Sequence, residues 1–128
     1  MKVLVVDDEV YVCELLYDFL SSEGYEVTFT TSGVEAITKF KDDRPDVVLL
    51  DIKMPGMDGL EVLRTLRAMD MKTGFIMLSA FGDFKTIQKA LGMGARHYIE
   101  KPFDLLRLHT VLAGWEASEE KRGSHGVS

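Results

Sequence analysis

Three aspartates and a lysine stand where short apolar runs of this 128-residue sequence end. Asp7 and Asp8 follow the first run, Asp51 follows the third, and Lys101 follows the fifth. If these runs are neighbouring parallel strands, the three carboxylates lie a few ångströms apart. At ~5 Å and an effective dielectric of ~20, each pair then costs about 3 kcal/mol. Such a cluster holds a proton or binds a cation, and carboxylate ligands favour Mg²⁺, Mn²⁺ or Ca²⁺ over zinc or copper.

The residues that accompany this acidic cluster are those of phosphoryl transfer. Ser79 and Ala80 follow the fourth apolar run, so that a hydroxyl donor is available, and Lys101 adds a positive charge. A divalent cation, a lysine and a hydroxyl around one exposed carboxylate favour transfer of a phosphoryl group. Asp51 is the expected acceptor, acting as a carboxylate nucleophile.

Five apolar runs alternate with five segments of helical periodicity, and this order must position the polar residues. Two of the runs are four consecutive aliphatic residues, the pattern of strands covered on both faces. The order predicts an α/β fold, a doubly wound (βα)₅ domain whose five-stranded parallel sheet has the flavodoxin-like order 2-1-3-4-5. In that order the first and third strands are neighbours at the switch point. The expected strands contain residues 3–6, 27–29, 47–50, 75–78 and 97–99.

Side-chain acceptors mark where four of the helices are expected to begin. Ser32, Asp58, Asp83 and Asp104 each precede an amphipathic segment and are predicted N-cap residues. Gly24 is expected to end the first helix in a left-handed conformation. The predicted core residues of the first helix are Val12, Leu15, Leu16, Phe19 and Leu20, and those of the fourth are Phe84, Ile87 and Leu91.

Composition excludes several classes of function. The chain has 21 acidic and 15 basic residues, a net charge of −6, which disfavours direct binding of nucleic acid. Its one cysteine, Cys13, excludes an internal disulfide and a multi-cysteine zinc site, and is expected to pack as a small apolar residue. The sequence shows no signal peptide and no apolar run near the ~20 residues that span a bilayer, so a cytoplasmic location without membrane contact is expected.

Four motifs now carry a family resemblance. They are Val5-Val6-Asp7-Asp8-Glu9, the segment 46–59 with its Asp-Ile-Lys-Met-Pro-Gly-Met-Asp-Gly end, Leu78-Ser79-Ala80, and the segment 98–103. In these motifs the chain resembles the receiver domain of bacterial two-component response regulators of the chemotaxis-regulator type. The expected domain organisation is a receiver over residues 1–115 and a polar tail over 116–128. The tail reads as frayed chain, as the start of a linker, or as residues added for expression.

The resemblance implies how the acidic residues work. Asp51 is the phosphoacceptor. Asp8 and Asp51, with the backbone carbonyl of Lys53, bind Mg²⁺ or Mn²⁺, and Asp7 acts largely through water.

The resemblance also implies roles for residues around the acceptor. Lys101, the Ser79 hydroxyl and the Ala80 amide bind the phosphoryl oxygens, although the family more often has Thr where Ser79 stands. Ser79 and Tyr98 form the switch, and the Lys101–Pro102 bond is cis. Lys53 and Phe81 are positions that tune hydrolysis of the phosphoryl group.

The implied partners are proteins. A histidine kinase or histidine phosphotransfer domain donates the phosphoryl group, and a downstream effector protein or domain responds to the changed surface of the fourth helix, fifth strand and fifth helix. The resemblance allows a phosphorylation-dependent homodimer. It also implies a signalling domain rather than an enzyme, because the domain would catalyse only its own phosphotransfer and dephosphorylation. We expect an apolar edge of Val10, Cys13 and Tyr17 on the first helix to dock the donor.

Two other functions stay open from the sequence. One is a receiver-like scaffold that is not phosphorylated, which would need a broken acidic pocket, whereas all three aspartates are present. The other is an aspartyl-nucleophile phosphatase of the haloacid dehalogenase type. That chemistry would want an aspartate two residues after the first, where this chain has Lys53.

Overall fold

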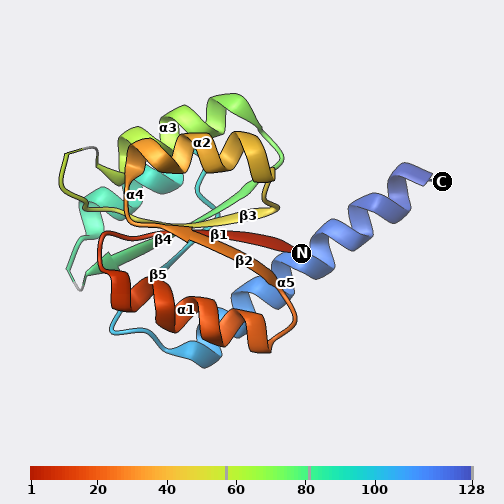
Figure 1. Ribbon diagram of the computed structural model, residues 1–128. Coiled ribbons are helices and arrows are strands. Elements are labelled where there is room, and N and C mark those ends of the chain that lie inside the picture. The colour runs from red at the N-terminus through yellow and green to blue at the C-terminus, as the bar shows by residue number, and fades with distance from the viewer. Residues whose placement is uncertain (57, 81, 128) are drawn as a thin grey trace.

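A computed structural model describes residues 1–56, 58–80 and 82–127 of the chain, with side chains up to residue 119. Strands and helices alternate through the described residues, and Figure 1 shows them as one layered unit. In chain order they are β1 (Lys2–Val6), α1 (Val10–Ser22), β2 (Glu26–Thr30), α2 (Gly33–Asp43), β3 (Val47–Asp51), α3 (Gly59–Met69), β4 (Gly74–Ala80), α4 (Phe84–Gly92), β5 (His97–Lys101) and α5 (Leu105–Val127).

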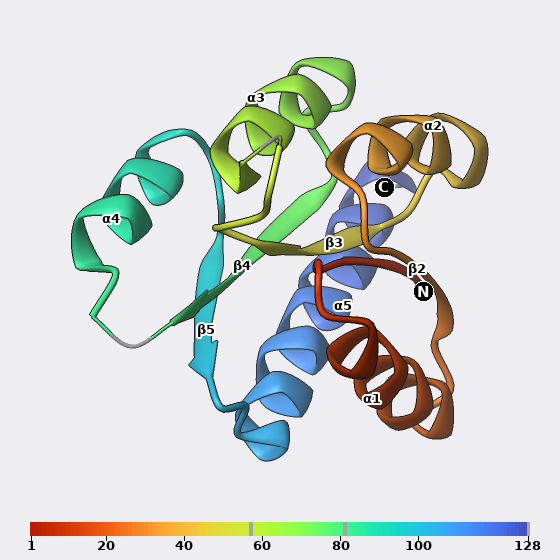
Figure 2. The ribbon, with the colours of Figure 1, turned by 60° about the vertical axis from the view of Figure 1, so that its left-hand side comes forward.

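The five strands form one parallel sheet in the order β2-β1-β3-β4-β5. Helices α1 and α5 cover one face, and α2, α3 and α4 cover the other (Figures 1 and 2). The predicted doubly wound (βα)₅ fold and its strand order are therefore confirmed. Because β1 and β3 are neighbours, the residues at their carboxyl ends meet at the switch point of the sheet.

The central strands are buried on both faces, which is why they read as unbroken aliphatic runs. Along β1, Leu4 and Val6 pack beneath α2, α3 and α4, whereas Val3 and Val5 pack beneath α1 and α5. The same alternation runs along β3, as the two-residue period of a strand requires. One apolar layer thus packs against each face of the sheet.

Helix α1 faces the sheet with the expected Val12, Leu16 and Leu20, but Cys13 is buried in place of Leu15. Its buried residues include Cys13, which is fully buried, whereas Leu15 is 45% exposed. The Cys13 thiol donates to the backbone oxygens of Asp7, at 3.3 Å, and Thr30, at 3.8 Å. Packing as a small buried residue is confirmed for Cys13. Its place on an exposed docking edge is wrong, because the residue lies on the buried face of α1.

Helix α4 also departs from its predicted core stripe. Ile87 is buried as expected, but Phe84 is 58% and Leu91 39% exposed, and Ala90 takes the second buried position. A short helix at the border of the sheet covers it with a narrow stripe, so the large apolar residues on either side remain at the surface.

Three of the four predicted N-caps form. Ser32, Asp58 and Asp104 each accept a hydrogen bond from a first-turn amide of their helix. Asp83 holds the N-cap position of α4, but its side chain caps nothing. The prediction for Asp83 is wrong because its carboxylate contacts Lys53 instead, with the Lys53 Nζ 3.0 Å from Asp83 Oδ1.

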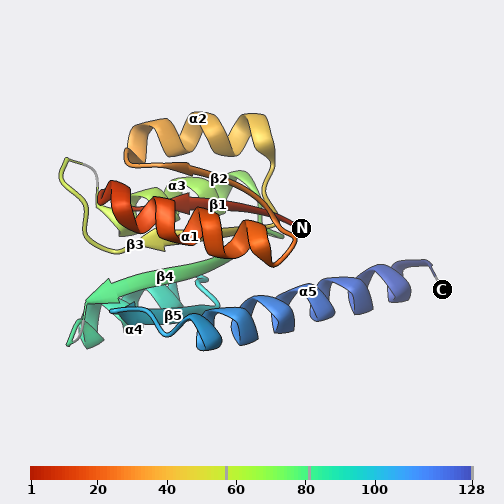
Figure 3. The same ribbon diagram turned by 60° about the horizontal axis from the view of Figure 1, so that its bottom comes forward.

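Helix α5 is longer than the sequence suggested. We expected it to reach Trp115 before a frayed tail, yet it continues to Val127 and projects past the sheet (Figure 3). Residues 116–122 are mostly strong helix formers, which accounts for the continuation. The division into a receiver and a tail at residue 115 stays a prediction. None of the helices in the described part of the chain combines the length and apolar character that crossing a bilayer requires.

Candidate functional site

The candidate site lies at the carboxyl edge of the sheet. Asp7 directly follows β1, Asp51 and Lys101 are the last residues of β3 and β5, and Ser79 is the next-to-last residue of β4. Strand pairing brings them into register, since Asp51 pairs with Leu78 and the residue after Ser79 pairs with Lys101. Several of these residues thus belong to strand ends rather than to the loops beyond them, which holds their backbones in the sheet.

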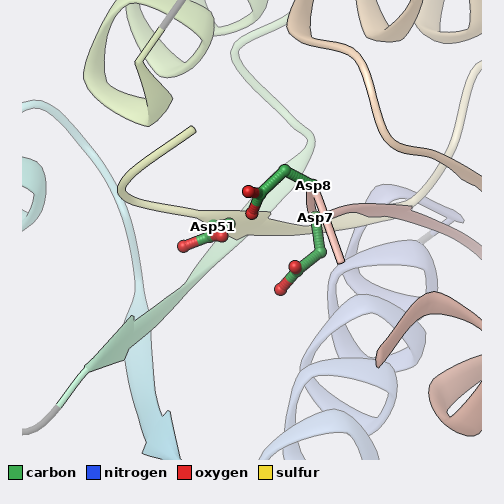
Figure 4. Close-up of side chains that lie close together, drawn as sticks. All are labelled: Asp7, Asp8 and Asp51. Carbon is green, nitrogen blue, oxygen red and sulfur yellow. The ribbon is translucent and has the colours of Figure 1, made fainter. Parts of the chain in front are cut away.

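Asp7, Asp8 and Asp51 form an acidic cluster. Each contributes a carboxylate oxygen, and these oxygens all lie within 4.8 Å of one another. Figure 4 shows the three side chains gathered where β1 and β3 end. Asp7 and Asp51 are buried, at 0% and 6% exposure, whereas Asp8 is exposed. The expected proximity of the three carboxylates is confirmed, and one side of the cluster is open.

Lys101 supplies a positive charge to this cluster. Its Nζ lies 2.7 Å from Asp7 Oδ2, 3.4 Å from Asp51 Oδ2 and 3.5 Å from Glu9 Oε1. The backbone amide of Glu9 donates to Asp7 Oδ1 at 2.9 Å, which fixes the other oxygen of that carboxylate. No role for Glu9 was predicted from the sequence, although its position directly after the aspartate pair was the available signal. One lysine thus faces three of the four carboxylates, so negative charge remains in excess.

The pKa shifts of these residues reflect their burial and the excess of negative charge. Burial raises the pKa of Asp7. Burial, followed by the charge of Asp7, raises the pKa of Asp51 to about 7, although Lys101 opposes the shift. For Lys101 burial acts to lower the pKa, but its hydrogen bond to Asp7 and the two negative charges outweigh burial and raise it. The lysine therefore stays charged, and added positive charge beside Asp51 would favour its ionised form.

The surroundings of Ser79 indicate which ligands the acidic cluster could hold. The residue is 1% exposed, and its hydroxyl has no hydrogen-bond partner among the described residues. A buried hydroxyl without a partner is costly, so a ligand oxygen within reach would stabilise it. Lys53 donates its amide to Asp51 Oδ1 at 3.2 Å, and Ala80 is exposed beside Ser79. Oxygen ligands, a cation, a hydroxyl and an open side suit a divalent metal together with a phosphoryl group.

A glycine allows α3 to pack against the end of β3. A Cβ on Gly59 would lie 2.0 Å from the backbone oxygen of Asp51, and the Gly59 amide donates to the Ile52 oxygen at 2.8 Å. No side chain fits there. The glycine of the Asp-Gly pair at positions 58 and 59 is thus explained by a close approach of two backbones.

Tyr98 and Lys53 come from two other parts of the same sheet edge, β5 and the loop after β3. Tyr98 is half-buried and packs at the border of the core beneath α4. The Lys101–Pro102 bond next to it is cis, as expected. The Lys53 side chain is 70% exposed and pairs with Asp83, a contact that the sequence did not predict. The role expected for Phe81 lies outside the described residues.

Comparisons with known proteins identify the family of the chain. A family model of the response regulator receiver domain matches residues 3–113. The chain is 38% identical over 104 residues to sporulation initiation phosphotransferase F of Bacillus subtilis, a match that covers 81% of this chain and 84% of that protein. It is 42% identical over 118 residues to the chemotaxis protein CheY of Treponema pallidum, covering 87% and 82%.

Solved structures lead to the same family. The receiver domain of NtrX from Brucella abortus superimposes with a TM-score of 0.84 at 35% identity, over 88% of this chain and 96% of that domain. Longer relatives also match: the chain spans 24% of the regulatory protein AtoC of Escherichia coli and 29% of a longer NtrX structure. With the family model, these matches show that the chain belongs to the response regulator receiver domain family.

Proposed function

We propose that this receiver domain accepts a phosphoryl group on the carboxylate of Asp51 in a Mg²⁺-dependent reaction. The observation that carries the proposal is the surroundings of Asp51. This carboxylate is buried beside two others, with the Lys101 Nζ 3.4 Å away. On the neighbouring strand lies the Ser79 hydroxyl, which has no hydrogen-bond partner in the part of the chain that the structure describes. Those are the groups that phosphoryl transfer to a carboxylate needs.

The residues of the site divide the work of the transfer. The Lys53 amide holds Asp51 Oδ1, so Oδ2 is the oxygen that forms the new bond to phosphorus while the donor's phosphorus–nitrogen bond breaks. Lys101 then pairs with a phosphoryl oxygen, and the Ser79 hydroxyl and Ala80 amide donate to the others.

The metal ligands of the proposal are Asp8, Asp51 and the backbone carbonyl of Lys53, with Asp7 acting largely through water. Mg²⁺, or Mn²⁺ in its place, supplies the positive charge that the cluster lacks. The excess of carboxylates over cations in the described site supports this assignment.

The proposed donor is a phosphohistidine of a histidine kinase or a histidine phosphotransfer domain. Helix α1 begins beside the acidic cluster and exposes Val10 and Tyr17, at 53% and 42%, an apolar edge that suits a protein partner. Replacing Tyr17 with Glu should slow transfer from the cognate kinase and leave phosphorylation by a small phosphodonor unchanged. Equal loss with both donors would contradict docking at this edge.

The proposed output is a change in the surface formed by α4, β5 and α5. The phosphoryl group adds roughly −1.5 to −2 charges, which draws Ser79 and Lys101 toward it and lets Tyr98 rotate inward. A partner protein, an attached domain or a second copy of the chain reads the altered surface, in the cytoplasm. The domain acts as a signalling element that catalyses only its own phosphorylation and dephosphorylation. An unphosphorylated scaffold is disfavoured because the acidic cluster is intact. An aspartyl-nucleophile phosphatase is disfavoured because Lys53 stands where that chemistry would want a second aspartate.

The test is labelling by a small phosphodonor such as acetyl phosphate in the presence of Mg²⁺. Asp51→Asn should abolish labelling, and chelation of the metal should abolish it in the unchanged protein. Asp42→Asn is the matched control because Asp42 is exposed on α2, away from the cluster. Labelling retained in Asp51→Asn, or lost in Asp42→Asn, would overturn the assignment.

A further inference from the structure

An ion pair connects the loop after β3 to the start of α4. Lys53 lies two residues after Asp51, and Asp83 directly precedes α4, yet the Lys53 Nζ lies 3.0 Å from Asp83 Oδ1. The Asp83 side chain is only 15% exposed and the Lys53 side chain 70%. The lysine thus reaches from solvent onto a largely covered carboxylate, and the two segments are joined across the edge of the sheet.

This contact takes Asp83 away from the task that its position favours. At the starts of α2 and α3, Ser32 and Asp58 have extended backbones, with ψ values of 129° and 162°, and their side chains accept first-turn amides. Asp83 has a ψ of 39° and makes no such bond. Aspartate is among the strongest N-cap residues, so pairing with Lys53 competes directly with capping of α4.

We propose that Asp83 is a positioning residue that exchanges between Lys53 and the first turn of α4 according to the state of the acceptor. In the resting domain it pairs with Lys53. When Asp51 carries a phosphoryl group, Lys53 turns to that group, and Asp83 then caps α4 by accepting from the amides of Lys85 or Thr86. The second state rests on the proposed function, whereas the first is a property of the resting chain.

Charge and geometry both support the exchange. The Lys53 amide already donates to Asp51 Oδ1 at 3.2 Å, so its flexible side chain begins beside the acceptor. A phosphoryl group adds roughly −1.5 to −2 charges there, against the single charge of Asp83. An ion pair whose lysine is largely exposed is weak and is readily given up. The release of Asp83 would carry the state of the acceptor to α4 without any movement of the sheet.

The resting state can be tested by amide hydrogen exchange, followed by NMR at Lys85 and Thr86 in metal-free protein. Lys53→Gln frees Asp83, so protection should rise about fivefold, the effect of a typical N-cap. Asp83→Asn removes the charge but keeps a capping oxygen, and should raise protection similarly. Asp83→Ala removes both and should not, alone or combined with Lys53→Gln. Unchanged protection in both Lys53→Gln and Asp83→Asn, or an equal rise in Asp83→Ala, would overturn the exchange.

The second state is tested with Mg²⁺ and beryllofluoride as the phosphoryl substitute. Protection at Lys85 and Thr86 should rise about fivefold in the unchanged protein and stay constant in Asp83→Ala. If beryllofluoride binds, as seen from shifted amide signals around Asp51, and protection does not rise, the exchange is refuted. If it does not bind at all, the proposed function fails, and the metal-free experiment still decides whether Lys53 and the cap compete.

Discussion

Replacing Asp51 with Asn is expected to stabilise the metal-free domain at neutral and alkaline pH. The side chain of Asp51 is 8% exposed. One carboxylate oxygen from each of Asp7, Asp8 and Asp51 lies within 4.8 Å of the other two. Asn has nearly the same shape and can still accept from the Lys53 amide, which bonds Asp51 Oδ1 at 3.2 Å. The substitution therefore removes a buried negative charge while preserving the packing.

The magnitude follows from the pKa of Asp51, which burial and the charge of Asp7 raise from 3.8 to about 7. At 1.36 kcal/mol for each pKa unit, ionising Asp51 in the folded domain costs about 4 kcal/mol. Between the two pKa values the folded chain holds a proton that the unfolded chain has lost, so stability falls as pH rises from about 4 to about 7 and then levels off. The Asp51→Asn variant has no ionisable group at this position, so its stability does not fall in this way.

The assay is urea unfolding with a chelator present, compared at about pH 5 and about pH 8. We expect Asp51→Asn to exceed the unchanged protein by about 2–4 kcal/mol at the higher pH and by a smaller margin at the lower. Asp42→Asn should show no pH-dependent gain. Saturating Mg²⁺ should narrow the difference, because the cation binds the folded cluster of the unchanged protein. A difference that is the same at both pH values, or a less stable Asp51→Asn at about pH 8, would refute the electrostatic reasoning.

Three further substitutions separate packing from charge. Ser79→Ala removes a buried hydroxyl that has no hydrogen-bond partner among the described residues, so it should leave the free energy of unfolding unchanged or raise it by about 1–3 kcal/mol, yet slow phosphorylation about tenfold or more; a urea titration showing a loss of stability would contradict this. Lys101→Ala leaves the Asp7 carboxylate buried without its 2.7 Å partner and should cost about 3 kcal/mol in the same titration, with a neutral effect as the contrary result. Gly74→Ala puts a Cβ 2.7 Å from the indole of Trp115 and should cost about 1–3 kcal/mol and change its fluorescence, so an unchanged spectrum would count against the packing described.

The fold and the gathering of the acidic cluster were predictable because both depend on local patterns. Unbroken aliphatic runs such as Val47–Leu50 indicate strands buried on two faces, and a parallel sheet with helical crossovers satisfies that burial. Once the order of the strands is given, the residues at their carboxyl ends must meet. Asp7, Asp8 and Asp51 then lie together whatever the details of the helices.

The errors arose where distant groups compete for one side chain. Periodicity placed Leu15 in the core, but Cys13 is buried there instead, with its thiol bonded to the backbone carbonyls of Asp7 and Thr30. Local preference made Asp83 a cap, but Lys53, from a different loop, pairs with it. Spacing along the chain describes neither contact, because each depends on where another element ends.

The alkylation rate of Cys13 would measure how often the segment that carries Asp7 opens. It is the only thiol in the chain, is fully buried, and donates to the Asp7 carbonyl at 3.3 Å. Burial and the charge of Asp7 raise its pKa to about 11, so the native thiol is protected from alkylating reagents both sterically and chemically. Alkylation then proceeds only through transient separation of α1 from the sheet, and its rate reports the free energy of that local opening. An unmodified copy of the chain thus contains its own kinetic probe, one hydrogen bond away from the acidic cluster.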